Sequence, residues 1–448
     1  MPNWQTWRRQ GLMWVLLCAA ISVAWGTQIA AGGNAWIDFR AVYAGTRCLM
    51  HGHNPYNVGD LAREYGSEDG PRPPATPLHI QSITLYVNMP TTFMIVAPFA
   101  ALAYGPATVL WMLATGGAFV LALLLMWRLG ARYAPRVSTF LICILAINCE
   151  SIFAGANTAG IVVGLCAIAV WCFLENRFVR VGVVCLALCL AVKPHDAGLI
   201  WLYFLLAGGV QRKRALQSLL ITVLIGLAAA GWVSHVAPTW MHDWKANLAT
   251  ISAPGGINEP GPSAVKDGSV YSIVDLQGAL SIFRDNPQFY NRATYAICGL
   301  FLLAWAVWTL RAGFSEDKAW LALSVATAFS MLVTYHRIWD AKLAMLVIPA
   351  CCMVWARRDR TGKAAFLVTA SALFVNGDIS LVILAAIVKS FPPSVSGMLG
   401  PVVACVTSRP ASVALLVLGV FYLGLYARHA LAPRSVAPVV AELEHVSL

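Results

Sequence analysis

The stretch GLMWVLLCAAISVAWGTQIAA, residues 11–31, is the first of many long apolar runs in this chain. A helix crosses the hydrocarbon core of a bilayer with about 20 residues, so this run predicts a transmembrane helix. Arg8 and Arg9 precede it and place the N-terminus in the cytoplasm. No small-residue cleavage site is followed by a soluble mature chain, so we interpret the run as a retained helix rather than a signal peptide.

The composition of the whole chain also indicates a membrane protein. Of 448 residues, 59% are hydrophobic and only 11% are charged, and the mean hydropathy is +0.69. The alternating strands of a membrane β-barrel are absent, so we expect an all-α polytopic membrane protein. The net charge of +11 gathers in short loops, which indicates topology signals and contact with anionic lipid rather than nucleic-acid binding. The 12 cysteines lie almost entirely in apolar runs and form neither a disulfide framework nor a zinc-like pair.

Apolar runs predict about twelve spans in a single integral membrane domain, residues 1–448, with both termini cytoplasmic. The expected spans are 11–31, 106–127, 137–153, 158–174, 181–192, 194–209, 216–236, 292–308, 319–335, 341–356, 363–388 and 410–427. The segment from Pro90 to Tyr104 is short and interrupted by Pro98. A broken segment there leaves every later arginine cluster inside, whereas a full span moves all of them outside, so the charge bias favours the broken segment.

This topology leaves two large loops on the outer side. The first, residues 32–90, begins with WIDFRAVYAG (36–45), whose aromatic side chains suit a short amphipathic helix at the membrane interface, and prolines 71, 73, 74 and 77 break its second half. The second, residues 237–291, is expected to form a partly ordered cap, with 255–268 as its most mobile part. A short cytoplasmic tail, 435–448, is expected to be unstructured.

Polar residues gather at the outer ends of the predicted helices. Asp38 lies within about one helical turn of the membrane surface, where a charge is costly unless it is hydrated, paired or used. Lys193, His336 and Arg337, with Arg40, form a cationic set that suits a phosphate. Asp38 suits the removal of a proton from a hydroxyl nucleophile. Together these residues favour the transfer of a group from a lipid phosphate to an alcohol.

Each of these residues also has a purely structural interpretation. Asp38 and Arg40 suit a surface ion pair. Residues 193–196 suit a turn between two helices, and His336-Arg337 suit interfacial charges paired with Asp340. Glu150 and Asn157 suit hydrogen bonds between helices, and Asn376 with Asp378 suits a buried structural pair.

The sequence lacks the motifs of several other enzyme classes. An Asp-x-Asp motif, a tight carboxylate cluster for a divalent ion, a GxSxG elbow and a nucleotide-binding loop in a plausible context are all absent. The cytoplasmic loops are too short for a nucleotide-sugar domain. An activated donor is therefore expected to come dissolved in the bilayer.

The motif DFRAVYAG (38–45), followed by HGHNPY (51–56), resembles the D-F-x-x-Y-x-A-(G/A) … G-x-(N/D)-P-Y signature of glycosyltransferase family 87. Further stretches match the family in the same order along the chain. They are NMP (88–90) with APF (97–99), GAN (155–157), KPH (193–195) and YHRIWD (335–340). The chain departs from the family where the first Pro of Y-P-P and the Gln of G-Q-x-N are missing, where His195 replaces a Gln, and where Thr334-Tyr335 replaces Ser-Pro.

The resemblance implies a GT-C-like, mannosyltransferase-like membrane enzyme of a bacterial inner membrane, acting at the periplasmic face. It implies a polyprenyl-phosphate sugar donor, an inverting transfer to a glycolipid or glycan hydroxyl, no cofactor and no metal. It implies that Asp38 is the general base. The expected substrate- and phosphate-binding residues are Arg40, Tyr43, Asn157, Lys193, His195, His336 and Arg337.

Two other functions remain open from the sequence. One is a non-catalytic transporter or lipid-binding protein of cell-envelope assembly, which inverted repeats and a mid-membrane polar pathway would favour. The other is a GT-C ligase of large glycans, which usually carries a bigger outer domain or an arginine-rich outer loop. The sequence shows none of these features.

Overall fold

A computed structural model describes residues 4–31, 36–67, 77–261, 272–390 and 400–431. Within these ranges the elements are helices, apart from one isolated β-bridge between Ile273 and Arg337. The expectation of an all-α membrane protein is therefore confirmed for the described chain. The expectations for prolines 71–74, for loop residues 262–268 and for the tail 435–448 lie outside the described residues.

Six helical segments of the described chain are long and apolar enough to cross a membrane. They are Arg9–Ile29 in α1 (Trp4–Ile29), α6 (Tyr104–Gly130), α7–α8 (Pro135–Gly155), α12 (Gly209–Val236), α15 (Pro287–Ala312) and α21 (Pro410–Leu431). Three shorter apolar helices accompany them, α5 (Thr91–Ala100), α9 (Thr158–Leu174) and α10 (Val179–Val192). At 10 residues α5 is about 15 Å long, which is half the thickness of a hydrocarbon core.

The remaining predicted spans are helical but shorter or broken. The 194–209 and 319–335 regions form α11 (Pro194–Leu206) and α16 (Glu316–Val333). The 341–356 region is a 3-10 helix, η4 (Asp340–Val347), followed by α17 (Ile348–Trp355). The 363–388 region divides into α18 (Arg360–Val375) and α19 (Asp378–Ser390), and α20 (Gly400–Ser408) precedes α21.

A buried polar network lies where α18 gives way to α19 and where α8 begins. Asp378, at the start of α19, accepts hydrogen bonds from the main-chain and side-chain donors of Ser151, 2.8 and 2.9 Å long. The Lys342 amine on η4 lies 3.1 Å from the same carboxylate and donates to the carbonyl of Asn376. The backbone groups freed where α18 ends and α8 begins are thus satisfied inside the protein, as a membrane interior requires.

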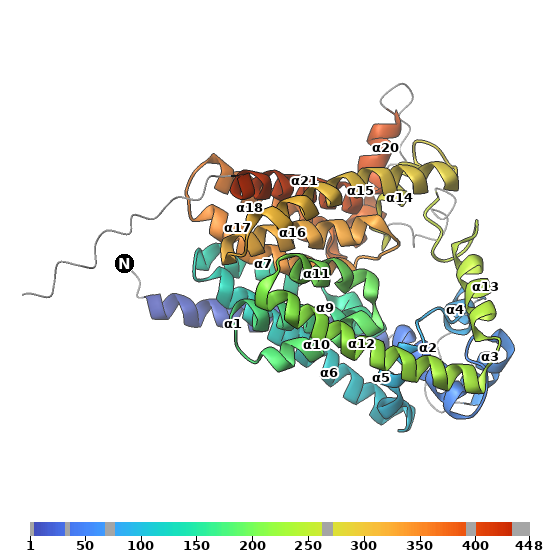
Figure 1. Cartoon of the computed structure of the whole chain (residues 1–448). Coiled ribbons are helices and arrows are strands. Elements are labelled where there is room, and N and C mark those ends of the chain that lie inside the picture. Colours follow the sequence, from blue (N-terminus) through green and yellow to red (C-terminus); the bar gives the residue numbers. More distant parts are fainter. Residues whose placement is uncertain (1–3, 32–35, 68–76, 262–271, 391–399, 432–448) are drawn as a thin grey trace, which may run out of the picture.

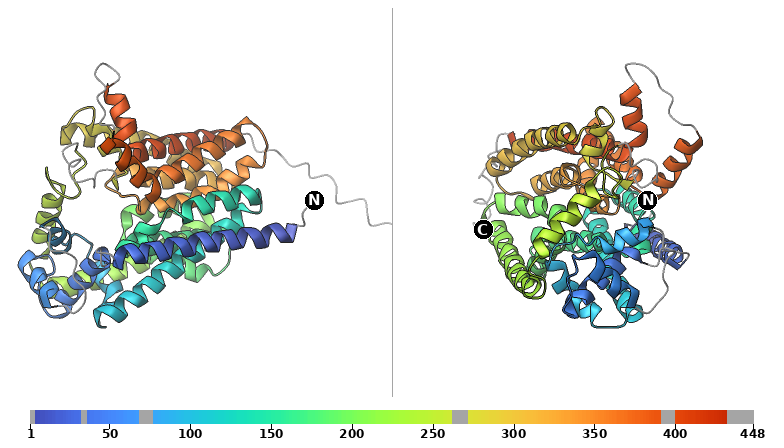
Figure 2. Two further views of the ribbon diagram at one scale, coloured as in Figure 1. Left: turned by 180° about the vertical axis from the view of Figure 1, so that it is seen from behind. Right: turned by 90° about the vertical axis from the view of Figure 1, so that its right-hand side faces the viewer.

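The two predicted outer loops lie at one end of the helix bundle. The first loop forms α2 (Ile37–Met50), α3 (Val58–Ser67) and α4 (Pro77–Thr84), and the cap loop contains α13 (Trp240–Ser252) and α14 (Leu276–Ser281). Figure 1 shows α2–α4 and α13 at the right-hand end, opposite the N-terminus, and Figure 2 (right) views the molecule from that end. At the other end of α6, Arg132 pairs with Glu175 and lies 4.0 Å from Glu316.

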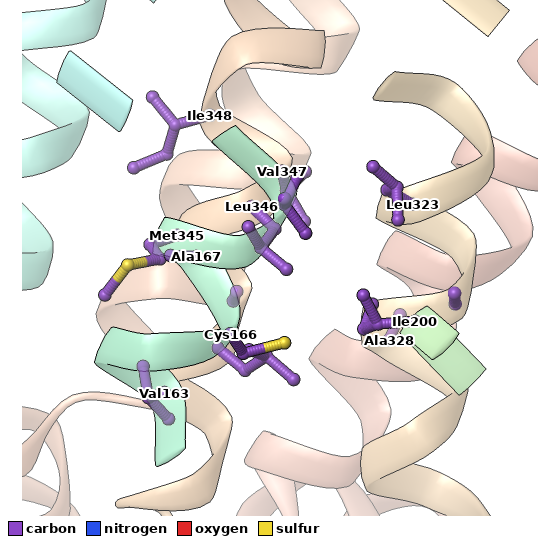
Figure 3. Close-up of a cluster of buried hydrophobic side chains, with 14 of the residues drawn as sticks. Val163, Cys166, Ala167, Ile200, Leu323, Ala328, Met345, Leu346, Val347 and Ile348 are labelled. Carbon is purple, nitrogen blue, oxygen red and sulfur yellow. The ribbon is translucent and has the colours of Figure 1, made fainter. Parts of the chain in front are cut away.

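Two apolar cores hold the bundle together. The larger one packs α9, α11, α16 and η4–α17 against each other, with side chains such as Cys166, Ile200, Leu323 and Met345 (Figure 3). The smaller one, between α2, α5 and the start of α6, is aromatic and includes Phe39, Tyr104 and Trp111. The smaller core seats α2 on the ends of the membrane helices, and so it positions the stretch that begins with Asp38.

Candidate active site

Asp38 lies in the first turn of α2, half-buried beneath the outer loops. Trp36, two residues before Asp38, is the N-cap of α2 and adopts a left-handed conformation with φ of 52°. Phe39, the next residue, stacks on Trp111 of α6 with ring centres 5.1 Å apart. The position of the Asp38 carboxylate is therefore fixed by a helix that is itself anchored by buried rings.

The junction between α8 and α9 wraps around the Asp38 carboxylate. The Asn157 side-chain amide donates a 3.0 Å hydrogen bond to Asp38 Oδ2, while its own oxygen caps α9 by accepting from the Ala159 N–H. A Cβ added to Gly155 would lie 2.5 Å from Asp38 Oδ2, so only glycine allows this approach. The carbonyl of Ala156, which has φ of 50°, accepts from the Trp111 indole. The motif of residues 155–157 is thus built around Asp38.

The environment raises the pKa of Asp38 above its ordinary value. Burial is the main cause, because removing the carboxylate from water disfavours its charged form. The hydrogen bond from Asn157 and the charges of Arg337 and Lys193 act in the opposite direction, and Asp340 adds to the rise. A carboxylate of raised pKa, held at the edge of a cationic region, is suited to accept a proton.

Lys193 lies at the break between α10 and α11 and points to the start of η4. Its amine donates to Asp340 Oδ1 at 2.5 Å, and both side chains are largely buried. Burial lowers the pKa of Lys193, but the charges of Asp340 and Asp196 outweigh it and keep the pKa above its ordinary value. Lys193 is therefore a fixed positive charge close to Asp38.

The two histidines meet at Asp196. His336 Nε2 lies 2.9 Å from Asp196 Oδ1, and both side chains are buried. His195, which is 39% exposed, approaches the same oxygen at 3.7 Å and lies against the His336 ring. Contact with Asp196 raises the pKa of His336 despite its burial.

Arg337 joins the cap loop to this region. Its guanidinium donates to Ser272 Oγ at 2.6 Å and to the carbonyl of Ile257 at 2.5 Å. Main-chain hydrogen bonds from Val274 to the His336 carbonyl and from Ile338 to the Ser272 carbonyl surround the β-bridge. The side chain of Arg337 thus holds the cap loop over the site.

Arg40 and Tyr43 point away from this group. The guanidinium carbon of Arg40 lies 4.2 Å from the centre of the Tyr104 ring, inside the aromatic core. The Tyr43 hydroxyl donates to the carbonyl of Leu102 at 2.7 Å. Both side chains anchor α2.

The structure therefore gathers five of the eight predicted site residues, with His195 beside them, around the outer ends of α2, α9, α10 and α16. These five are Asp38, Asn157, Lys193, His336 and Arg337. Sequence reasoning missed the roles of Gly155 and Asp196. Gly155 could have been recognised from its position two residues before Asn157, the residue that caps α9, and opposite the motif that begins with Asp38. Asp196 gave no signal of its own, since its partner is 140 positions away in the sequence.

The bundle has the helices of a multi-pass membrane protein, and the candidate site lies at one end of them. The sequence model of glycosyltransferase family 87 matches residues 86–334, more than half of the chain. The chain belongs to glycosyltransferase family 87, and the resemblance seen in its motifs is confirmed. The matched region includes Gly155, Asn157 and Lys193 and begins after Asp38. No curated protein and no solved structure matches the chain. Family membership makes it a membrane glycosyltransferase.

Proposed function

We propose that this glycosyltransferase moves a single sugar from a polyprenyl-phosphate donor to a hydroxyl of a glycolipid or cell-envelope glycan, with inversion at C1. We also propose that it lies in a bacterial inner membrane with its site facing the periplasm. The observation that carries the proposal is the Asp38 carboxylate, held by Asn157 and Gly155 within the influence of the Lys193 charge.

The proposed reaction is a single displacement. The acceptor oxygen attacks C1 of the sugar and forms the new C1–O bond while Asp38 takes its proton. The bond between C1 and the phosphate oxygen breaks, and its electron pair leaves with polyprenyl monophosphate. Attack opposite the leaving group inverts C1. Asp38 returns to its ionised form when the proton passes to solvent.

Support for a phosphate donor comes from Lys193. Its ammonium group keeps its charge although it is largely buried and paired with Asp340, so it suits the negative charge that grows on the departing phosphate. His336 contacts Asp196, and Arg337 binds the cap loop, so we assign His336 to positioning the first turn of α11 and Arg337 to positioning the loop. His195, the exposed member, is proposed to face the donor.

The test of the base is Asp38→Asn in reconstituted bilayers with a labelled lipid-linked sugar donor. We expect a loss of kcat of about 10²–10⁴-fold, the range for removing a general base. Asp60→Asn is the matched control, because Asp60 is a carboxylate of the same loop whose side-chain contacts, with Arg63 and the Asn54 N–H, are local. Activity near that of the wild type in folded Asp38→Asn protein excludes Asp38 as the base.

The test of the phosphate contact is Lys193→Ala. We expect at least about a tenfold loss of kcat/KM for the donor, equivalent to about 1.4 kcal/mol of transition-state stabilisation. Lys245→Ala, at an exposed lysine of α13, is the control. Unchanged donor kinetics in Lys193→Ala contradict the assignment.

A further inference from the structure

We infer that Tyr335 is a donor-binding residue whose hydroxyl donates a hydrogen bond to the phosphate of the lipid-linked sugar. The inference rests on the proposed function and adds a contact that none of the predicted site residues supplies. Tyr335 lies between the end of α16 and the start of η4, in the segment that carries His336 and Arg337. In the family pattern, Ser-Pro stands where this chain has Thr334-Tyr335. Proline has no side-chain donor, so the contact is a feature of this chain.

The segment from Thr334 to Arg337 is extended, so its side chains alternate between two sides. Thr334 has extended φ and ψ, and Arg337 lies in the β-bridge. His336 faces Asp196 on one side and is fully buried. Tyr335 and Arg337 share the other side, where the guanidinium carbon lies 5.6 Å from the centre of the tyrosine ring. The alternation therefore separates the buried histidine from a half-buried tyrosine–arginine pair.

The Tyr335 hydroxyl accepts one hydrogen bond and keeps its own hydrogen for another partner. Its oxygen accepts from Nε of Arg337. A guanidinium only donates, so the phenol hydrogen is not used in this contact. Among the residues that the structure describes, no oxygen or nitrogen accepts that hydrogen. A phenol that accepts from a guanidinium becomes a stronger donor, because hydrogen bonds in a chain polarise one another.

The charges around the Tyr335 hydroxyl favour a phosphate oxygen as its acceptor. Lys193, Arg337 and Asp340 act electrostatically on the phenol. The same three side chains act on Asp38, so Tyr335 and Asp38 border one region. The Arg337 guanidinium is committed to the cap loop, whereas the Lys193 ammonium has three hydrogens and donates one to Asp340. A sugar phosphodiester has two non-bridging oxygens, and we assign one to Lys193 and the other to Tyr335.

The experiment compares Tyr335→Phe with the wild type, both full-length and reconstituted in bilayer discs. Farnesyl phosphate and farnesol are titrated by calorimetry, so that the difference between them isolates the phosphate. Affinities are compared between proteins in the same discs, so partition into the lipid cancels. We expect Tyr335→Phe to lose affinity for farnesyl phosphate by about tenfold or more and to keep its affinity for farnesol, because a hydrogen bond to a charged group is stronger than one to a neutral group. Tyr295→Phe, at an exposed tyrosine of α15, is the matched control.

Two further measurements separate the phosphate contact from the support that the hydroxyl gives to Arg337. In Tyr335→Phe the guanidinium keeps its contacts with Ser272 and Ile257, so limited proteolysis within residues 251–261 should run at the wild-type rate. 3,5-Difluorotyrosine at position 335 keeps the oxygen for Arg337, but fluorine lowers the pKa of the phenol. The phosphate affinity of that protein should therefore fall as the pH rises toward the ordinary tyrosine pKa of about 10, well before that of the wild type does.

The outcomes separate this contact from the proposed reaction. Wild-type affinity for farnesyl phosphate in folded Tyr335→Phe overturns the inference. An equal loss of farnesol affinity, a loss that comes with faster cleavage of the cap loop, or a wild-type pH dependence in the difluorotyrosine protein also overturns it. A wild type that binds farnesyl phosphate no better than farnesol rejects the phosphate donor of the proposed function and this contact with it. Asp38→Asn should bind farnesyl phosphate at least as tightly as the wild type while losing sugar transfer, so failure of the base leaves the Tyr335 test intact.

Discussion

Replacing Asn157 by serine is expected to shift the pH dependence of sugar transfer toward higher pH. The Asn157 amide donates to Asp38 and so favours the ionised carboxylate, which is the form that accepts a proton. Its loss raises the pKa of Asp38 further, and the acid limb of the kcat profile moves with it. A hydrogen bond to a charged group contributes about 1.5–3 kcal/mol, and one pH unit corresponds to about 1.4 kcal/mol, so the expected shift is about 1–2 pH units.

Serine is chosen because it separates the two roles of Asn157. It still caps α9, as the asparagine does by accepting from Ala159, but its shorter side chain does not reach Asp38. Asn157→Asp also keeps the cap and adds a like charge, so its shift should be larger. Asn286→Ser is the control, because Asn286 also caps a helix, α15, by accepting a main-chain hydrogen bond, from Phe289.

The assay measures kcat for a labelled lipid-linked donor in bilayer discs from about pH 5 to 9, with circular dichroism to confirm the fold. The order wild type, serine variant, aspartate variant is expected for the midpoint of the acid limb. If both variants at 157 keep the wild-type midpoint, then the Asn157 contact does not tune the base. If Asp38→Asn retains an acid limb with the same midpoint, the limb does not belong to Asp38.

Three further predictions concern geometry and stability. Gly155→Ala places a Cβ against Asp38 Oδ2 and should lower kcat by about tenfold or more. Gly299→Ala, which has open space around its Cβ, is the control and should leave kcat unchanged. Equal kcat values for the two variants would refute the argument that a Cβ at residue 155 displaces the carboxylate. Lys342→Met leaves the buried Asp378 carboxylate without its cation and should destabilise the fold by about 3–5 kcal/mol, measured by thermal unfolding, and an unchanged midpoint would contradict it. Arg337→Lys loses several hydrogen bonds to the cap loop and should therefore speed limited proteolysis within residues 251–261. An unaltered cleavage rate would show that the Arg337 guanidinium does not hold the cap loop in place.

Local patterns predicted the fold class and the motifs that meet at Asp38. Apolar run length is set by bilayer thickness, so the sequence predicts membrane helices, but of the twelve spans expected, six helical segments of the described residues are long and apolar enough to cross a bilayer. Asn157 and Lys193 were named because each stands at the outer end of a predicted helix, while the 155–157 stretch was matched through the family resemblance. Helix breaks were harder to predict, because the break before Asp378 depends on Ser151 and Lys342, which are distant in sequence.

The placement of Arg40 shows another limit of reading a motif. It stands two residues after Asp38, and residues two apart on a helix point in nearly opposite directions. A short motif therefore does not place all its side chains in one site: Asp38 faces Asn157, while Arg40 and Tyr43 face the aromatic core. Asp196 escaped prediction for a different reason, since only the folded chain brings it to His336.

The β-bridge joins Ile273 of the cap loop to Arg337 after α16, and the side chains of Ile273 and of Ile338 beside it are buried. A change of side chain at Ile273 is therefore expected to disturb the buried segment after α16 as well as the cap loop itself.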